Sequence, residues 1–404
     1  MQSSGPVSLS AAPRTNRPPT ILLGVTSPQT CLILGARLRA LRQAGFRVLL
    51  VSSPGELLDS TAAREQVEPI PIPMQREIAP LSDPLSLFRL WLLLVRRRPD
   101  LVEFSTPKAG LLGTFAAMLC GVPRRVYMLR GLKCETAAGL KRHLLFAAER
   151  LTAACAHVVL CNSESLRRQA ISLGLAAERK LRLLGEGSSN GVDVGHFSPG
   201  LSNVREKLGI PRSAKVVGFV GRLTCDKGLP ELVDAFDSIL RAEPAARLLL
   251  VGWFDAAEDA LGQDLRTRIL RHSRIDCTGF VRDTAPYYRA MDVLVLPTFR
   301  EGFPNVVLEA AASGVPVVTT ECTGARDSVV SEVTGMLVPP GYPEAISEAV
   351  LKIICNPERR NRMGQAARLW ILEHYIESRV LALTANYYRG LVDSTVPATH
   401  YPNP

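Results

Sequence analysis

The chain has 404 residues, of which 47% are hydrophobic and 21% are charged. This balance is typical of a folded globular protein and excludes global disorder, and the length is sufficient for two domains. The net charge of +10 is concentrated in residues 1–200, which carry 25 Lys and Arg against 14 Asp and Glu. Such a surplus suits an anionic membrane surface or a diphosphate-bearing substrate; no RNP, zinc-finger or helix-turn-helix pattern favours nucleic acid.

The cysteines and the first residues indicate a cellular compartment. The nine cysteines are scattered and form no C-x-x-C pair, which predicts buried thiols in a reducing environment without a disulfide framework or a zinc site. Residues 1–19 contain no apolar core of a signal peptide or membrane anchor, and we predict a disordered tail. These features predict a cytoplasmic protein.

Residues 20–185 alternate short apolar runs with longer segments of helical character. This alternation predicts a doubly wound α/β domain. We expect strands at 21–25, 47–53, 101–105, 124–129, 157–163 and 181–184, with a short VEPIPI run at 67–72, and helices at 30–44, 84–98, 108–120, 137–155 and 164–173.

The Gly- and Ser-rich residues 186–200 predict a connection to a second domain over 201–370. A second alternating series fills that domain. We expect strands at 215–222, 247–252, 275–280, 292–297, 315–320 and 335–340, and helices at 228–241, 257–272, 284–290, 304–313, 343–355 and 357–392.

The βαβ unit over 292–320 carries two carboxylates. Pro304 suits a first helical turn, and the loop before it joins the carboxyl end of a strand to a helix N-terminus, where open parallel sheets bind ligands. Glu301 and Glu309 bracket this turn. An ionised carboxylate accepts two O–H donors, as neighbouring sugar or ribose hydroxyls present them. The alternative is that one acid complements the helix dipole and the other lies on a solvated face.

Two cations stand in the strand-to-helix connection of GRLTCDKG. Arg222 ends the strand and Lys227 lies five residues on. Together they suit a leaving diphosphate, on which charge builds as a glycosidic bond breaks. The alternative is a pair of solvated surface cations. Because the sequence contains no Asp-x-Asp at a strand end, we expect no metal site.

The string EGFPNVVLEAAASGVPVV, from Glu301 to Val318, resembles the donor-site signature of the family-4 retaining glycosyltransferases of the GT-B fold. The resemblance implies two Rossmann-like domains facing across a cleft, with a C-terminal helix (371–404) that returns to the first domain. It implies that Glu301 contacts the donor sugar and Glu309 the ribose, and that Arg222 and Lys227 bind the diphosphate. The remaining expected donor contacts are Gly221, Val281, Gly302, Phe303 and Asn305, whereas Trp253 is expected to pack a loop. NGVD (190–193) and FSP (197–199) resemble the interdomain crossover of the family.

On the acceptor side the expected residues are Thr26 and Ser27, in GVTSPQ, with Lys108 and Arg130. STPKAGLLG and YMLRGLKCE resemble the branch of the family that assembles bacterial polysaccharides. Many relatives place a histidine where this chain has Phe104-Ser105 or Arg130, so an acceptor-side general base is left open. The six histidines are expected to be structural or on the surface.

The resemblance implies a metal-independent retaining hexosyltransferase without a cofactor. Its donor would be a nucleotide diphosphate sugar, most simply UDP-linked, and its acceptor a polyprenyl-diphosphate-linked glycan for capsule, O-antigen or exopolysaccharide. Retention would use front-face attack, with the departing phosphate taking the acceptor proton. The alternatives are a UDP-sugar 2-epimerase of the same fold, which needs acid and base groups from both domains, and a non-catalytic nucleotide-sugar binder.

The segment PLSLFRLWLLLVRRR (84–98) has two interpretations. Nine of the eleven residues from Leu85 to Val95 are apolar, too few for a span of about 20 residues. The helix could lie in the inner membrane interface, with Phe88 and Trp91 at the headgroup boundary and Arg96 to Arg98 against anionic lipid. Alternatively, it is fully buried, with the arginines as its solvated C-terminal cap.

Overall fold

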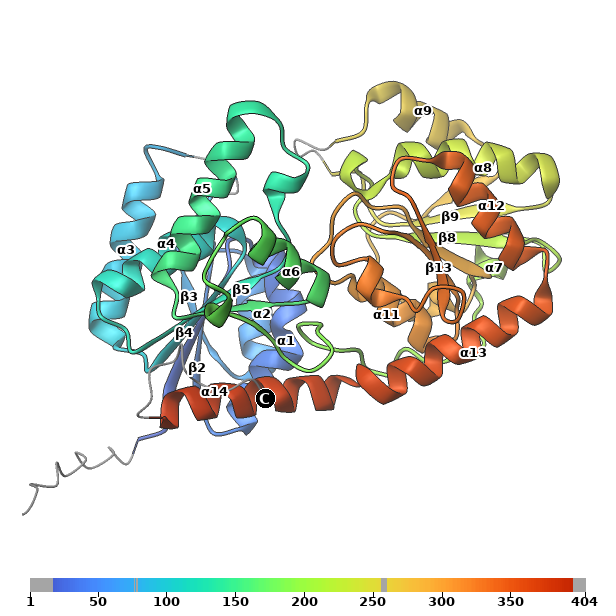
Figure 1. Cartoon of the computed structure of the whole chain (residues 1–404). Coiled ribbons are helices and arrows are strands. Elements are labelled where there is room, and N and C mark those ends of the chain that lie inside the picture. Colours follow the sequence, from blue (N-terminus) through green and yellow to red (C-terminus); the bar gives the residue numbers. More distant parts are fainter. Residues whose placement is uncertain (1–16, 76, 78, 256–259, 395–404) are drawn as a thin grey trace, which may run out of the picture.

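The structure is a computed structural model that describes residues 17–75, 77, 79–255 and 260–394, so most of the predicted disordered tail lies outside the described residues. Two parallel sheets form separate lobes (Figure 1). The first has the strand order β3-β2-β1-β4-β5-β6-β7 and the second has the order β10-β9-β8-β11-β12-β13. Both are doubly wound, as predicted. In each sheet the strand order reverses beside the first strand, and ligands bind at such switch points.

The N-terminal lobe covers its sheet with helices on both faces. α1 and α2 pack together on one face, while α3, α4 and α5 follow one another on the other. The strands are β1 (Thr20–Gly24), β2 (Arg47–Ser52), β3 (Glu68–Pro71), β4 (Leu101–Ser105), β5 (Arg124–Leu129), β6 (Val158–Cys161) and β7 (Leu181–Leu183). The helices are α1 (Pro28–Gln43), α2 (Glu56–Glu65), α3 (Asp83–Arg97), α4 (Pro107–Leu119), α5 (Gly139–Cys155) and α6 (Glu164–Ser172).

The C-terminal lobe repeats this design, with α8 and α12 packed together and α11 against α13. Its strands are β8 (Val216–Val220), β9 (Arg247–Val251), β10 (Ile275–Cys277), β11 (Val293–Leu296), β12 (Val317–Thr320) and β13 (Gly335–Val338). The helices after β7 are α7 (Val204–Lys207), α8 (Leu229–Ala242), α9 (Gln263–Arg271), α10 (Ala285–Tyr288), α11 (Asn305–Ala312), α12 (Pro343–Ile354), α13 (Pro357–His374) and α14 (Glu377–Asp393).

Three helices differ from the sequence prediction, and one of them is the four-residue α7, which was not predicted. The prediction missed α2, whose sequence ELLDSTAARE buries only Leu58, Thr61, Ala62 and Glu65, so its apolar period is weak. Polar Thr61 and Glu65 occupy the buried face and break the pattern. The helix predicted from Ala257 begins at Gln263, while residues 256–259 lie outside the described residues.

Two segments pass side by side between the lobes. Val192, in the first crossover, donates its N–H to the carbonyl of Tyr375 at 2.8 Å and accepts from the N–H of Glu377 at 3.0 Å. The chain then enters α14, which lies under the N-terminal lobe (Figure 1). Tyr387, Tyr388 and Leu391 join the core around β1 and α1. The final helix therefore belongs structurally to the first lobe.

The outer face of α3 is apolar and exposed. Leu85, Phe88, Trp91 and Val95 are 37–55% exposed, and the rings of Phe88 and Trp91 stack with centroids 5.9 Å apart. Only Ser86, Leu90 and Leu94 are buried, against the neighbouring helix and sheet. The fully buried alternative is therefore wrong. No helix of the described residues is long and apolar enough to cross a membrane.

Candidate active site

Most of the predicted donor residues meet where strands β8 and β11 end. Gly221 and Arg222 follow β8, and the loop 297–304 follows β11 and leads into α11. Because adjacent parallel strands end at the same edge, Lys227 and Glu301 come together although 74 residues separate them. Lys227 Nζ lies 2.5 Å from Glu301 Oε1, and both side chains are more than four-fifths buried. They line a cavity of about 230 Å³ together with Gly221, Gly302, Phe303 and Asn305, which we call the donor-side cavity.

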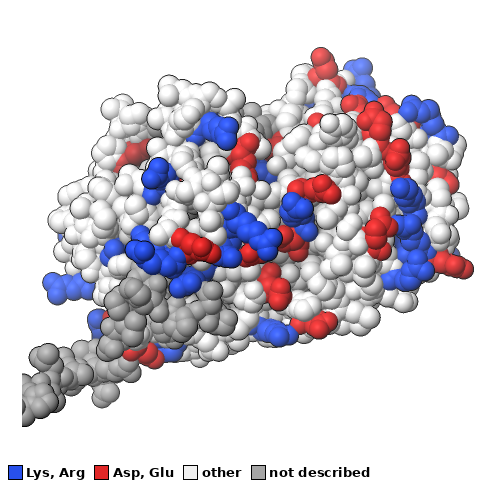
Figure 2. Space-filling model, viewed as in Figure 1, with Lys and Arg blue, Asp and Glu red and all other residues white. Residues whose placement is uncertain are grey.

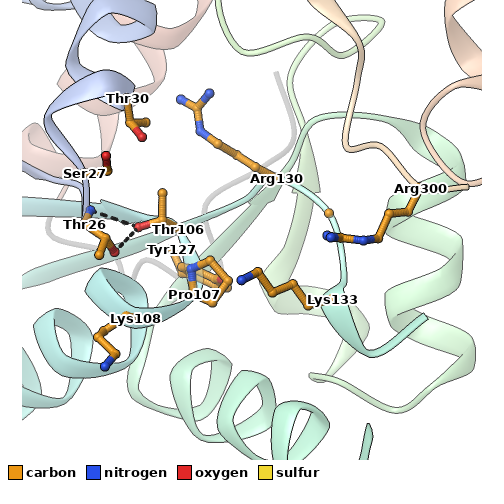
Figure 3. A pocket seen from close by; sticks show the side chains of 11 residues that line it. Thr26, Ser27, Thr30, Thr106, Pro107, Lys108, Tyr127, Arg130, Lys133 and Arg300 are labelled. Carbon is orange, nitrogen blue, oxygen red and sulfur yellow. Dashed lines mark hydrogen bonds between the residues drawn. The ribbon is translucent and has the colours of Figure 1, made fainter. Parts of the chain in front are cut away.

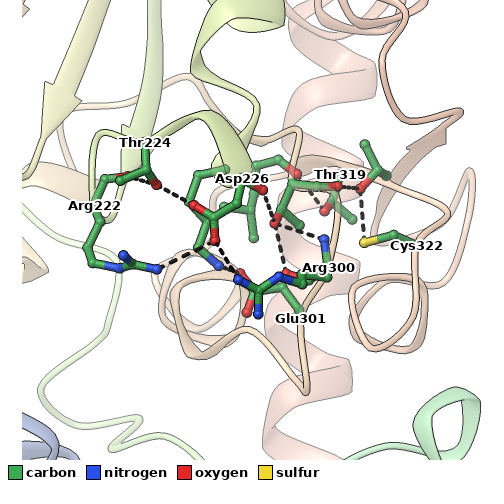
Figure 4. A network of polar contacts seen from close by, with 11 residues as sticks. Arg222, Thr224, Asp226, Arg300, Glu301, Thr319 and Cys322 are labelled. Carbon is green, nitrogen blue, oxygen red and sulfur yellow. Dashed lines mark hydrogen bonds and ion pairs between the residues drawn. The ribbon is translucent and has the colours of Figure 1, made fainter. Parts of the chain in front are cut away.

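A carboxylate that sequence reasoning missed organises the cations of this loop (Figure 4). Asp226 Oδ1 accepts the hydroxyl of Thr224 at 2.5 Å, while its Oδ2 lies 3.5 Å from Arg222 Nη2 and 3.4 Å from Arg300 Nη2. Burial alone would raise the pKa of Asp226, but the Thr224 hydroxyl and the charges of Lys227, Arg222 and Arg300 outweigh it and hold the pKa below its usual range. Asp226 thus remains ionised between the two guanidinium groups.

Arg222 is held from its other side by Asp255, whose Oδ2 lies 3.0 Å from Arg222 Nη1. The side chain of Arg222 is about one quarter exposed. Arg222 is therefore a partly exposed cation with two carboxylate partners, and it does not line the donor-side cavity.

Glu309 lies on α11 and does not line the donor-side cavity. The hydroxyl of Tyr288 donates to Glu309 Oε2 at 2.7 Å, and that of Thr284 does so at 3.4 Å. Burial raises the pKa of Glu309, although these two hydroxyls oppose the shift. Both recorded hydrogen bonds go to Oε2, so the geometry leaves Oε1 as the oxygen for a further hydroxyl donor.

The two lobes touch backbone to backbone beside Glu301. A Cβ atom on Gly302 would lie 2.5 Å from the carbonyl carbon and oxygen of Arg130, so only glycine fits at this position. Gly131 has φ +120° and faces the same loop. This close approach places Arg130 of the N-terminal lobe in the wall of the donor-side cavity.

A second cavity of about 240 Å³ contains all four predicted acceptor-side residues (Figure 3). Thr26 and Ser27 follow β1, Lys108 begins α4, and Arg130 follows β5. Sequence reasoning missed Lys133, and also Arg300, which enters from the C-terminal lobe. We call this space the acceptor-side cavity. On the face shown in Figure 2, Lys and Arg side chains gather on the N-terminal lobe beside the junction.

Other residues lie elsewhere. Val281 packs against the C-terminal core and does not line the donor-side cavity. Trp253 and Phe280 are both exposed and contact each other edge to face at 5.5 Å, so Trp253 packs a loop neighbour. None of the five described histidines lines either cavity. Within the described ranges, no group of three or more His, Cys, Asp or Glu side chains could hold a metal ion.

Two family models match the chain, one for each lobe. Residues 35–185 match the glycosyl transferase 4-like domain, and residues 214–356 match glycosyl transferases group 1. A capsular polysaccharide biosynthesis glycosyltransferase, CapM of Staphylococcus aureus, is 36% identical over 348 residues, which are 85% of this chain and 90% of the relative. The chain belongs to the family-4 glycosyltransferases of the GT-B fold.

Other relatives agree with this assignment. The UDP-Gal:alpha-D-GlcNAc-diphosphoundecaprenol alpha-1,3-galactosyltransferase of Escherichia coli is 28% identical over 69% of this chain and 72% of its own length. Anabaena Alr3699/HepE, solved in complex with UDP and glucose, superposes with a TM-score of 0.77 over 92% of this chain and 99% of its own, at 20% identity. The sequence prediction of a GT-B glycosyltransferase is therefore confirmed.

Proposed function

We propose that this glycosyltransferase moves a hexose or N-acetylhexosamine, with retention of configuration, from a UDP-sugar to a polyprenyl-diphosphate-linked cell-surface glycan. The observation that carries the proposal is the Lys227–Glu301 pair in a cavity that Arg130 of the N-terminal lobe also lines. A cation and a hydroxyl-binding carboxylate then stand side by side, as a sugar diphosphate requires. The Escherichia coli and Anabaena relatives, named for a UDP-sugar reaction and a UDP complex, support UDP as the nucleotide.

Each residue has a chemical role in this proposal. Lys227 and Arg222 stabilise the charge that builds on the leaving diphosphate, because fixed cations cost no reorganisation when the bond breaks. Glu301 accepts hydrogen bonds from donor hydroxyls and orients the sugar. The acceptor attacks from the side of the departing phosphate, whose oxygen takes the acceptor proton. Such a mechanism requires no acceptor-side base, which agrees with the absence of a described histidine from both cavities.

The side chains of the N-terminal lobe disfavour the 2-epimerase alternative. In the donor-side cavity that lobe contributes Ile33, Arg130 and Asn162, and the crossover contributes Ser189. None of these described lining residues is a carboxylic acid or histidine. An epimerase needs acid and base groups on both sides of the sugar. Separation of the reaction products distinguishes the two activities. Transfer to an acceptor supports the proposal, whereas conversion of a UDP-sugar into its 2-epimer would contradict it.

The donor can be identified by thermal protection. Each of UDP-glucose, UDP-galactose, UDP-N-acetylglucosamine, GDP-mannose and ADP-glucose is added to the purified protein while its unfolding is followed. Ligand at about 100 times its Kd stabilises the fold by about 2.7 kcal/mol, so the true donor raises the Tm. Protection by a GDP or ADP sugar and by no UDP sugar would contradict the assignment of the base.

We also propose that the N-terminal lobe docks on an anionic membrane surface through α3. Its exposed apolar face (Leu85, Phe88, Trp91 and Val95) ends beside the exposed Arg96 and Arg98. Apolar area and cationic charge act together at an interface, and each Arg near anionic lipid adds about 1 kcal/mol. A lipid-linked acceptor supplies the reason for docking.

Flotation with anionic liposomes at low and high salt tests the docking. Phe88→Ser with Trp91→Ser should abolish binding, whereas the matched pair Leu270→Ser and Leu369→Ser, at exposed positions of the C-terminal lobe, should not change it. Unchanged binding of the α3 variant would contradict this surface.

A further inference from the structure

The acceptor-side cavity has the charge of an anion site. Its described lining contains the cations Lys108, Arg130, Lys133 and Arg300 and the hydroxyls of Thr26, Ser27, Thr30 and Thr106, but no Asp or Glu. Lys108 is neutralised, because its Nζ lies 2.8 Å from both carboxylate oxygens of Asp83, at the start of α3. Asp226 is shared between Arg300 and Arg222. The residues that line the cavity thus include more cations than acids.

Among the cations of this lining, Arg130 most clearly lacks hydrogen-bond partners. Its Nε and Nη2 are buried and have no hydrogen-bond partner. Glu103, the carboxylate whose charge acts on Arg130, is already used by Arg37 at 2.9 Å and by the hydroxyl of Tyr388 at 2.6 Å. Two guanidinium groups therefore share one acid. Burial, and the neighbouring charge of Arg37, lower the pKa of Arg130 to about 10, which leaves it charged at neutral pH. A cation whose donor nitrogens are buried without hydrogen bonds destabilises a fold unless an anion compensates it.

The backbone around the cavity supports the same conclusion. The N-termini of α1 and α4 converge there, at Ser27 and Thr106. Thr106 has φ +78°, a left-handed conformation that is costly for a β-branched residue. Its Oγ1 accepts the N–H of Thr26 at 3.1 Å, and Thr26 Oγ1 in turn accepts the N–H of Ala109. Strain of this kind persists where a site requires a fixed geometry, and helix N-termini favour anions.

We propose that the acceptor-side cavity binds the diphosphate group of a lipid-linked acceptor, with Arg130, Lys133 and Arg300 as its cationic ligands. This inference rests on the proposed function. That the diphosphate belongs to a lipid is inferred from the position of the cavity next to the exposed apolar face of α3. Lys108, in the cavity wall, is bonded to Asp83, and the exposed apolar face of α3 begins two residues later at Leu85. A diphosphate in the cavity therefore lies beside the surface that suits its hydrocarbon chain.

The two cavities are neighbours. Arg130 lines both of them, and Arg300 and Glu301, which are adjacent in the chain, line one each. The proposed diphosphate site therefore adjoins the proposed donor site.

Calorimetry on protein saturated with UDP tests the diphosphate site, because UDP occupies the donor-side cations first. Inorganic pyrophosphate, farnesyl diphosphate and farnesol are titrated in turn. Farnesyl diphosphate should bind most tightly, and Arg130→Met or Lys133→Gln should weaken both diphosphates about tenfold or more through the loss of charge-assisted hydrogen bonds. Arg271→Gln, which removes an exposed charge from α9, should change nothing.

The possible results distinguish a failure of the diphosphate-site proposal from a failure of the proposed function. Equal binding of farnesol and farnesyl diphosphate, or unchanged binding in Arg130→Met, would overturn the diphosphate site. Pyrophosphate that binds as tightly as farnesyl diphosphate would overturn its lipid part. Failure to bind UDP in the first step would instead contradict the proposed function.

Stability measurements distinguish a ligand-binding role of Arg130 from a structural one. Met keeps most of the side-chain volume and removes the uncompensated charge, so the Tm of Arg130→Met without added ligand should equal or exceed that of the parent. A clear fall in the Tm would make Arg130 structural and overturn its role.

Discussion

Lys227 and Glu301 form an ion pair with Nζ and Oε1 2.5 Å apart, so the cation expected at the donor diphosphate and the acid expected at the donor sugar support each other. The two residues come from loops after β8 and β11, which are neighbours in the sheet. Each side chain limits the rotamers of its partner. A substitution at one position therefore affects the orientation of the other, and effects at the two positions should not be additive.

Glu301→Ala should lower kcat by about 100-fold, since loss of an orienting hydrogen bond misplaces the reacting sugar. The fold should remain intact, because Glu301 belongs to no core cluster of the described residues. Steady-state kinetics with the donor found by thermal protection, together with the Tm, provide the measurement. Turnover close to that of the parent would show that Glu301 does not orient the donor.

Glu309→Ala should weaken UDP binding by roughly 1.5–3 kcal/mol, which corresponds to the loss of a charge-assisted hydrogen bond to the ribose. Tyr288→Phe is the matched control. It removes the 2.7 Å hydrogen bond that holds the carboxylate but keeps the charge, so it should weaken UDP binding less. Calorimetry measures both affinities. If Glu309→Ala bound UDP as tightly as the parent, the ribose assignment would be wrong.

Arg222→Ala and Lys227→Ala should each lower kcat by about 100- to 1,000-fold while weakening UDP binding less, because leaving-group charge is greatest in the transition state. Arg241→Ala, at an exposed position near the end of α8, controls for the loss of one positive charge. The informative comparison is between kcat and the Kd for UDP. Equal losses in both quantities would assign the two cations to ground-state binding.

Treatment with EDTA should leave the transfer rate unchanged, because Lys227 and Arg222 supply the positive charge at the expected leaving group. The assay compares initial rates before chelation, after chelation and after addition of Mg²⁺ or Mn²⁺. Loss of activity that either ion restores would show that the reaction depends on a metal.

Glu149→Gln should change how stability depends on pH. Glu149 accepts the hydroxyl of buried Tyr127 at 2.8 Å, and burial raises its pKa from 4.5 to about 7. The folded state therefore binds the proton more tightly, and the free energy of unfolding of the parent decreases as the pH rises through this range.

Gln does not titrate, so the stability of the variant relative to the parent should increase by about 3 kcal/mol between about pH 4 and pH 8. Denaturant titrations across this range measure the difference, and Glu348→Gln, an exposed position on α12, is the control. A constant difference would show that Glu149 does not titrate with a raised pKa.

Much of the fold followed from local patterns. Short β-branched runs between helical segments indicated most strands of both sheets, because buried parallel strands are apolar throughout. The edge strand β3, EPIP, is half exposed and lacks this signal. Helix α2 was missed since polar Thr61 and Glu65 occupy its buried face. The residue types also predicted where a ligand would be bound, because Arg222, Lys227 and Glu301 stand at strand-to-helix connections, where side chains face ligands.

Long-range partnerships came only from the tertiary structure. Asp226 and Arg300 adjoin Lys227 and Glu301 in the sequence, which could have drawn attention to them, but no local signal shows that Asp226 lies between Arg222 and Arg300. The contact of Tyr288 with Glu309 and the shortage of carboxylates around Arg130 likewise depend on elements far apart in the chain.

The sequence by itself determined the alternation of strands and helices, the family signature and the charge surplus of the first half, because these are properties of neighbouring residues. The tertiary structure decided which side of α3 is exposed and that Arg130 borders both cavities. It could do so because burial and charge pairing depend on the packing of separate elements. Exposure of α3 is set by its contact with α4, and the environment of Arg130 by the approach of Gly302 from the other lobe.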